Sequence, residues 1–146
     1  MQMTFVRPAL TALALGALVF AATPVFADTV SYKAELRASA EVPPNDSKGN
    51  GTLDAAYDTA SKKLTWTITY AGSTGPATAA HFHGPAAAGS NAPPVVPLSG
   101  TLTSPIKGDA MLTEAQLADL QAGRWYLNIH TADHKDGELR GQVMKN

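Results

Sequence analysis

Apolar and polar residues alternate along several short stretches of the chain, with turn-forming residues between them. The clearest stretch is 64–70, where large apolar residues alternate strictly with threonine. Successive side chains of a β-strand point to opposite faces, so one face of this strand is buried and the threonine face meets water. Similar patterns predict strands at residues 29–36, 51–57, around 81–83, 95–98 (an edge strand, because it contains proline), 124–131 and 138–144.

One helix interrupts these strands at about residues 113–122. Thr113 and Gln116 have the spacing of a capping box at its start, and Gly123 is a natural stop after its end. Few apolar residues lie on this segment, so we expect it to rest on the surface. Many short strands, frequent turns and one short surface helix predict an all-β fold, an antiparallel Greek-key β-sandwich or barrel.

Residues 1–27 have the pattern of a secretory signal peptide. Arg7 supplies the positive charge, and residues 9–22 form an apolar run that is shorter than the about 20 residues of a comfortable membrane span. Cleavage before Asp28 would leave a single domain, residues 28–146, that is secreted or periplasmic. The alternative is an uncleaved N-terminal anchor.

Charge and composition exclude several classes of function. The 11 Lys and Arg residues against 12 Asp and Glu give a net charge of −1, which offers no basic surface for nucleic acid or for an anionic membrane after signal cleavage. The chain has no cysteine, so thiol nucleophiles, disulfides and thiolate metal sites are excluded. A transition-metal site must therefore use histidine, carboxylate or methionine.

All four histidines lie in two short segments, which hold His81 with His83 and His130 with His134. One residue separates His81 from His83, so a strand points both imidazoles to the same face. In the strand 124–131, His130 lies on the face opposite the apolar residues. If the apolar faces of the two strands share a core, three histidines emerge together on the outside.

Such a cluster predicts a binding site for a transition-metal ion. With nitrogen ligands alone, affinity favours Cu²⁺ over Zn²⁺, so copper is the expected ion and zinc the second candidate. His134 is either a fourth ligand or an exposed residue of the turn. Alternatively, the histidines hydrogen-bond to backbone carbonyls and stabilise the fold without a metal.

A metal-ligating histidine usually has its other ring nitrogen held by a nearby acceptor. Asp133, Glu138 and Asn128 are the candidates for this position, because they lie close to His130 in the sequence. Glu138 is also placed to pair with Arg140, since residues two apart on a strand share a face.

Three segments carry a resemblance to a known family: 80–86 (Ala-His-Phe-His-Gly-Pro-Ala), 126–131 (Tyr-Leu-Asn-Ile-His-Thr) and 137–142 (Gly-Glu-Leu-Arg-Gly-Gln). On these segments the mature chain resembles the chordin-type (CHRD) domain family, which also occurs as a stand-alone secreted domain in bacteria. The resemblance implies a secreted β domain and brings no established enzymatic activity.

The histidine pattern has a second, weaker likeness, to copper–zinc superoxide dismutase. There a His-X-His pair and a later histidine belong to the copper site, and His81, His83 and His130 match that arrangement. The chain lacks that family's cysteine pair. The likeness is limited to the arrangement of these histidines and does not extend to the rest of the sequence.

These observations predict a secreted CHRD-domain protein that binds copper through strand histidines and handles the metal outside the cytoplasm. A first alternative is an extracellular interaction module, whose exposed loops 43–51 and 86–94 recognise a protein partner while the histidines are structural. A second alternative is a superoxide dismutase-like copper redox enzyme, which an open coordination position would favour.

Overall fold

The computed structural model describes residues 27–146, so the predicted signal peptide, apart from Ala27, lies outside the described residues. The regular structure of this part consists of short strands, one α-helix and one 3-10 turn. In chain order the elements are β1 (Thr29–Arg37), η1 (Ala38–Ala40), β2 (Asn50–Asp58), β3 (Lys63–Ala71), β4 (Ala77–His83), β5 (Pro94–Pro97), β6 (Ile106–Met111), α1 (Glu114–Gln121), β7 (Tyr126–Thr131), β8 (Leu139–Gln142) and β9 (Met144–Lys145).

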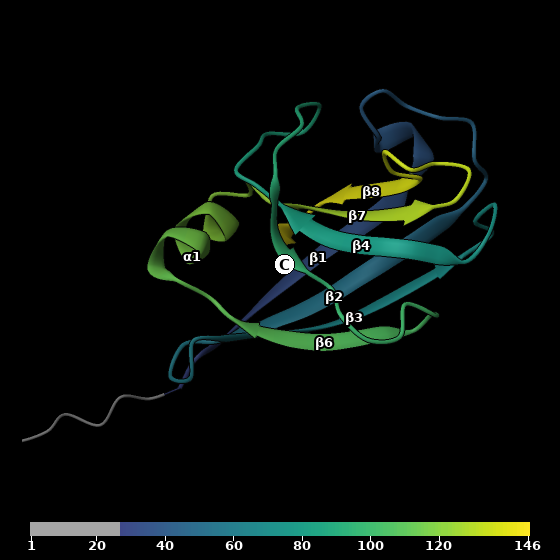
Figure 1. Ribbon diagram of the computed structural model, residues 1–146. Coiled ribbons are helices and arrows are strands. Elements are labelled where there is room, and N and C mark those ends of the chain that lie inside the picture. Colours follow the sequence, from purple (N-terminus) through teal and green to yellow (C-terminus); the bar gives the residue numbers. More distant parts are fainter. Residues whose placement is uncertain (1–26) are drawn as a thin grey trace, which may run out of the picture.

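The strands form one antiparallel sheet that bends around the core into a nearly closed barrel (Figure 1). Their order is β5-β4-β7-β8-β1-β2-β3-β6, with β9 paired to β1. One wall of the barrel consists of β5, β4, β7 and β8, and the other of β1, β2, β3 and β6. The arrangement confirms the predicted all-β antiparallel sandwich or barrel, and β5 is an edge strand, as its proline indicates.

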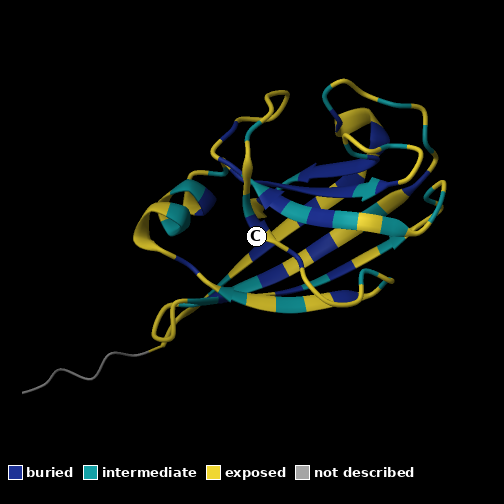
Figure 2. Ribbon diagram, in the orientation of Figure 1, coloured by how far each residue is buried: buried dark blue, intermediate teal, exposed yellow. Residues whose placement is uncertain are grey.

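Alternating burial places the core between the two walls. Figure 2 shows buried and exposed residues alternating along the long strands. The ring centroids of Trp66 and Phe82 lie 5.2 Å apart, and those of Phe82 and Trp125 lie 5.7 Å apart. Each large apolar side chain contributes about 2–3 kcal/mol when it is buried, so this aromatic row holds β3, β4 and the start of β7 together.

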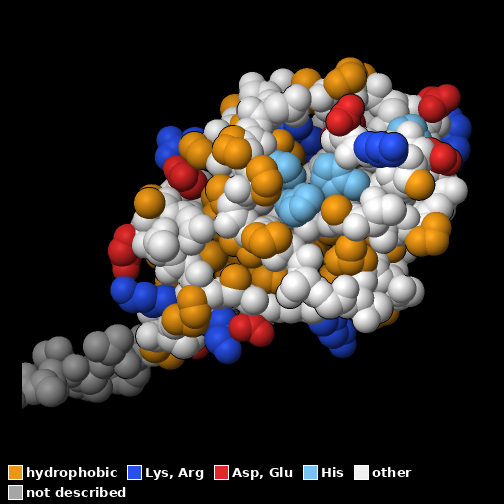
Figure 3. Space-filling view, viewed as in Figure 1, with side chains coloured by type: hydrophobic (Ala, Val, Ile, Leu, Met, Phe, Trp, Pro, Cys, Tyr) orange, Lys and Arg blue, Asp and Glu red, His pale blue; other side chains and the backbone are white. Residues whose placement is uncertain are grey.

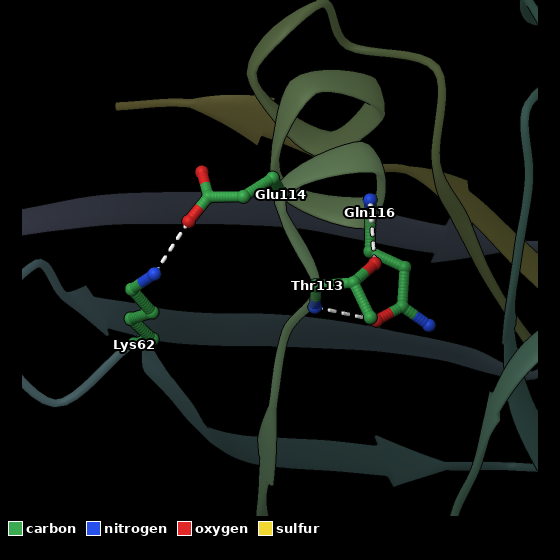
Figure 4. A network of polar contacts seen from close by, with 4 residues as sticks. All are labelled: Lys62, Thr113, Glu114 and Gln116. Carbon is green, nitrogen blue, oxygen red and sulfur yellow. Dashed lines mark hydrogen bonds and ion pairs between the residues drawn. The ribbon is translucent and has the colours of Figure 1, made fainter.

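The predicted helix is present as α1, and its start is stabilised by the expected cap (Figure 4). The Thr113 hydroxyl accepts a hydrogen bond from Gln116 N at 3.2 Å, and the Gln116 side chain accepts one from Thr113 N at 2.9 Å. Glu114 forms an exposed ion pair with Lys62 at 2.6 Å, which links the helix to the β2–β3 turn. Within residues 27–146, no helix has the length and apolar character of a membrane span.

Two details of the strand pattern differ from the sequence prediction. β6 is present although the sequence pattern does not indicate it, and it pairs with β3 along its whole length. The strand predicted at 138–144 is divided into β8 and β9, which pair with different stretches of β1.

Candidate metal centre

The two histidine-bearing strands, β4 and β7, are direct neighbours in the sheet. In their antiparallel register His83 lies opposite Tyr126, His81 lies opposite Asn128, and His130 lies opposite Ala79. Phe82 and Ala80 are buried in the core, so their neighbours His81 and His83 point outward. The same alternation in β7 points His130 outward, which confirms the arrangement on which the predicted cluster depends.

Three imidazoles meet on this outer face. His81, His83 and His130 each offer a ring nitrogen, and these nitrogens all lie within 4.8 Å of one another. Nδ1 of His81 is 3.3 Å from Nε2 of His130. Figure 3 shows histidine side chains gathered into one patch on the surface. The site is thus half-buried and reachable from solvent.

Backbone carbonyls fix the orientation of two of the rings. Nδ1 of His83 is 2.9 Å from the carbonyl oxygen of Ala92, and Nδ1 of His130 is 2.8 Å from that of Lys135. Because a carbonyl oxygen only accepts, Nδ1 is the donor in both bonds. A neutral imidazole then carries its lone pair on Nε2, so both rings present Nε2 as the ligating atom.

His83 Nε2 is buried and has no hydrogen-bond partner among residues 27–146. Burial lowers the pKa of His83, and the neighbouring His81, His130 and Arg140 add to this effect, while the bond to Ala92 opposes it. Burial also lowers the pKa of His81, with a further contribution from His130. Both changes favour the neutral imidazole, which is the form that binds a metal ion.

Behind His83, two more side chains continue the outer face across β7 and β8. The Tyr126 ring is stacked on the His83 ring, with centroids 4.8 Å apart and planes 7° apart. The Arg140 guanidinium carbon lies 3.5 Å from the centroid of the Tyr126 ring. Both Tyr126 and Arg140 are buried, although they point away from the core.

These buried residues are covered by the loop that carries Ala92. The Tyr126 hydroxyl accepts a hydrogen bond from Ala92 N and donates one to Ala92 O, each at 3.1 Å. Arg140 donates to the side-chain oxygen of Asn91 at 2.8 Å and to the carbonyl of Ser90. Tyr126 and Arg140 therefore hold the loop whose carbonyl orients His83.

The loop after η1 covers the same face from the other side. Its buried Glu41 accepts a hydrogen bond from the Asn128 side chain. Burial raises the pKa of Glu41 to about 7, against the lowering effects of Arg140 and the Asn128 bond. Between the loops lies a cavity of about 360 Å³, whose lining includes Glu41, Tyr126, Asn128, Arg140 and His83.

The predicted acceptors for the histidine rings are not the ones that the structure uses. Asn128 hydrogen-bonds to Glu41, and Glu138 accepts bonds from Ser47, Thr74 and Thr131. Burial alone would raise the pKa of Glu138, but these hydrogen bonds outweigh it and hold the pKa below its usual range. The predicted pair of Glu138 with Arg140 is also wrong, since the two side chains have different partners.

His134 lies in the β7–β8 turn and is not a member of the three-histidine cluster. Its backbone closes the turn: its carbonyl accepts hydrogen bonds from Thr131 N at 3.3 Å and Gly137 N at 3.1 Å. Tyr126, Arg140 and Glu41 complete the surroundings of the cluster. Alternation along the strand places Tyr126 on the same face as His130, but the local sequence pattern does not indicate that Glu41 and Arg140 lie near the histidines.

Comparison with known proteins yields one family. The family model described as the CHRD domain matches residues 32–143, a range that contains all the residues of the cluster and of its surroundings. Neither the curated proteins nor the solved structures contain a match to this chain.

Proposed function

The chain belongs to the CHRD domain family, and we propose that it binds one transition-metal ion, copper in preference to zinc, through His81, His83 and His130. CHRD domains occur in extracellular proteins. The proposed role is therefore metal binding or handling outside the cytoplasm, after secretion. The predicted signal peptide at residues 1–27 is part of this proposal.

The spacing of the three ligating nitrogens carries the proposal. A metal–nitrogen distance of about 2.0–2.1 Å and tetrahedral angles place two ligand nitrogens about 3.3 Å apart. His81 Nδ1 and His130 Nε2 are 3.3 Å apart, and all three nitrogens fit within 4.8 Å. Small side-chain rotations suffice to bring them around one ion. With nitrogen donors only, copper binds more tightly than zinc.

The surroundings of the rings support the same function. The carbonyls of Ala92 and Lys135 accept hydrogen bonds from the Nδ1–H groups of His83 and His130, as the outer acceptors of metal-ligating histidines do. They leave Nε2 of His83 buried without a partner. A buried nitrogen lone pair is costly unless something binds it, and a metal ion would satisfy it.

His81 would change its proton position when a metal binds. Nε2 of His130 is the acceptor in its contact with His81, so Nδ1 of His81 is the donor there. An ion bound between these atoms replaces that hydrogen, and the His81 proton then resides on Nε2. Metal binding at neutral pH therefore needs a change of tautomer at His81 alone.

Isothermal titration with Cu²⁺ and then Zn²⁺ tests the proposal. We expect one ion per chain, with tighter binding of copper. The variants His83→Ala and His130→Ala should each weaken copper binding by more than the about 10–100-fold typical of lost outer acceptors. His134→Ala is the matched control and should bind as the wild type does. Equal binding by all four proteins would contradict the proposal.

The open side of the cluster favours a second candidate, a copper redox enzyme. His81 and His130 are half-buried, and three protein ligands leave a coordination position for a small molecule. Superoxide dismutation by the copper-loaded protein, measured against free copper at the same concentration, tests this candidate. If neither metal binds, the family membership favours an extracellular interaction module whose histidines are structural.

A further inference from the structure

We infer that Arg140 selects the oxidation state of the bound copper, and that its buried guanidinium, which lies on the Tyr126 ring behind His83, favours Cu⁺ over Cu²⁺. The inference rests on the proposed copper site and names the ion that this site is suited to hold. It starts from the three stacked side chains of His83, Tyr126 and Arg140, each from one of three neighbouring strands.

The stack connects the charge of Arg140 to the metal ligand. His83 on β4 lies directly opposite Tyr126 on β7, and their rings are almost parallel. Arg140 comes from β8, on the other side of β7. Because β7 lies between the two strands, the imidazole and the guanidinium take opposite faces of the tyrosine ring. Only the Tyr126 ring therefore separates the Arg140 guanidinium from the imidazole of His83.

Arg140 is buried and forms no ion pair within residues 27–146, although the carboxylate of Glu41 in the same cavity partly offsets its charge above about pH 7. The residue is 2% exposed, and none of the four ion pairs found within residues 27–146 includes it. Its hydrogen-bond acceptors are the neutral oxygens of Asn91 and Ser90. A buried charge of this kind is screened much less than one at the surface.

A nearby fixed cation opposes Cu²⁺ more than Cu⁺, because Cu²⁺ carries one more unit of charge. At an effective dielectric constant of about 20 and a separation on the order of 10 Å, one unit charge changes an equilibrium by about tenfold. A tenfold change in the ratio of the two affinities corresponds to about 59 mV in a one-electron reduction potential.

Arg140 and Tyr126 also act as positioning residues, since both hold the loop whose Ala92 carbonyl orients His83. This mechanical effect changes the affinity for both copper ions in the same direction. The charge effect, in contrast, changes their ratio. The ratio of Cu⁺ affinity to Cu²⁺ affinity thus separates the two roles.

The test is to measure both affinities at pH 8, each by competition with a coloured chelator specific for that ion. Arg140→Met should lower the ratio of Cu⁺ to Cu²⁺ affinity about tenfold. Arg140→Lys keeps the charge and should keep the ratio within about threefold of the wild-type value. Tyr126→Phe removes the loop contact of the hydroxyl and should weaken both affinities while leaving the ratio unchanged.

Glu41→Gln should change the ratio of Cu⁺ to Cu²⁺ affinity in the opposite direction. It removes a buried acidic group from the same cavity and keeps the acceptor for Asn128, so the ratio should rise. If circular dichroism shows that Arg140→Met does not fold, this variant decides the question. An unchanged ratio in the folded Arg140→Met and Glu41→Gln proteins would overturn the inference while the proposed function stands. Absence of binding of either ion to the wild type would overturn both.

Discussion

The outer faces of the two barrel walls differ in what covers them. On β2 and β3, threonines and charged residues meet solvent: Thr52 and Thr69 share an exposed hydrogen bond of 2.9 Å, and Lys63 lies 3.5 Å from Asp109 in an exposed ion pair. On β7 and β8, the outward-facing Asn128 and Arg140 are only 2% exposed. Both faces alternate in sequence, yet only the second is buried under loops.

This difference in solvent exposure determines how strongly polar and charged side chains interact with one another. Exposed charges are screened, and their pairs contribute about 0–1 kcal/mol. Beneath the loops, the same kinds of group acquire altered pKa values, as Glu41 and His83 do, and retain strong electrostatic interactions. The histidine cluster lies at the edge of this covered face. Changes on the two faces should therefore have very different consequences.

The largest expected effect is that of Glu138→Ala, which should lower the free energy of unfolding by about 3 kcal/mol. The substitution leaves the buried hydroxyl of Thr131 without its acceptor, and it also removes the acceptor of the part-buried hydrogen bonds from Thr74 and Ser47. Urea denaturation measures the change. Asp54→Ala, an exposed carboxylate on β2, is the matched control and should leave the midpoint unchanged. An equal loss of stability in the two variants would contradict the proposed difference between the two faces.

The next effect is a pH dependence of stability caused by Glu41. Its pKa in the folded protein is about 7, above the ordinary value of 4.5 for this side chain, so its contribution is fully present below about pH 4.5 and is lost as the pH rises through about 7. The loss should be at most about 3 kcal/mol, since a tenfold change in proton affinity corresponds to about 1.4 kcal/mol. Denaturation at pH 4.5, 6 and 8 measures it. Glu41→Gln should remove this part of the pH profile, and an unchanged profile would contradict the assignment.

A smaller effect is expected for Tyr126→Phe, which keeps the ring on His83 but removes both hydroxyl contacts with Ala92. Stability should fall by about 1 kcal/mol. Copper affinity should fall by about tenfold, as expected for a residue that supports a ligand indirectly. Denaturation and titration measure the two quantities. Tyr57→Phe is a control hydroxyl deletion away from the site, and an equal loss of copper affinity there would argue against this role.

The smallest effect is that of Asp109→Asn on the exposed face, which removes the ion pair with Lys63. We expect a loss of at most about 0.5 kcal/mol, which disappears in 1 M salt because the pair is screened. Urea denaturation at low and high salt measures it. A loss above about 1 kcal/mol would show that the solvated face contributes more than the comparison allows.

Alternation was enough to predict most of the barrel, because one face of each long strand is buried. It did not predict β6, whose sequence Ile-Lys-Gly-Asp-Ala-Met contains a single β-branched residue and no aromatic residue, although such residues are typical of strands. Packing selects this segment: a Cβ atom at Gly108 would lie 2.8 Å from Cζ2 of Trp66. Glycine at this position allows β6 to approach the Trp66 indole. This contact joins distant parts of the sequence, so it cannot be predicted from the local sequence pattern.

For the cluster of His81, His83 and His130, the spacing predicted the face on which each imidazole lies. The pairing of β4 with β7, which brings the three rings together, was only a condition of that prediction and is known from the sheet topology. The acceptors of the imidazole protons were not predictable. They are backbone carbonyls of Ala92 and Lys135, supplied by loops, and every residue type has such a carbonyl. Burial of Arg140 likewise depends on loops that cross the outer face from distant parts of the sequence.

The most direct test of the metal centre is long-range ¹H–¹⁵N NMR of the imidazole nitrogens during titration with Zn²⁺, which is diamagnetic. We expect the Nε2 resonances of His83 and His130 to shift on binding one equivalent, while their Nδ1 atoms stay protonated and hydrogen-bonded to the loop carbonyls. His81 should exchange its tautomer in the same step. Shifts confined to His134, or spread equally over all four histidines, would contradict a single site at the three-histidine cluster.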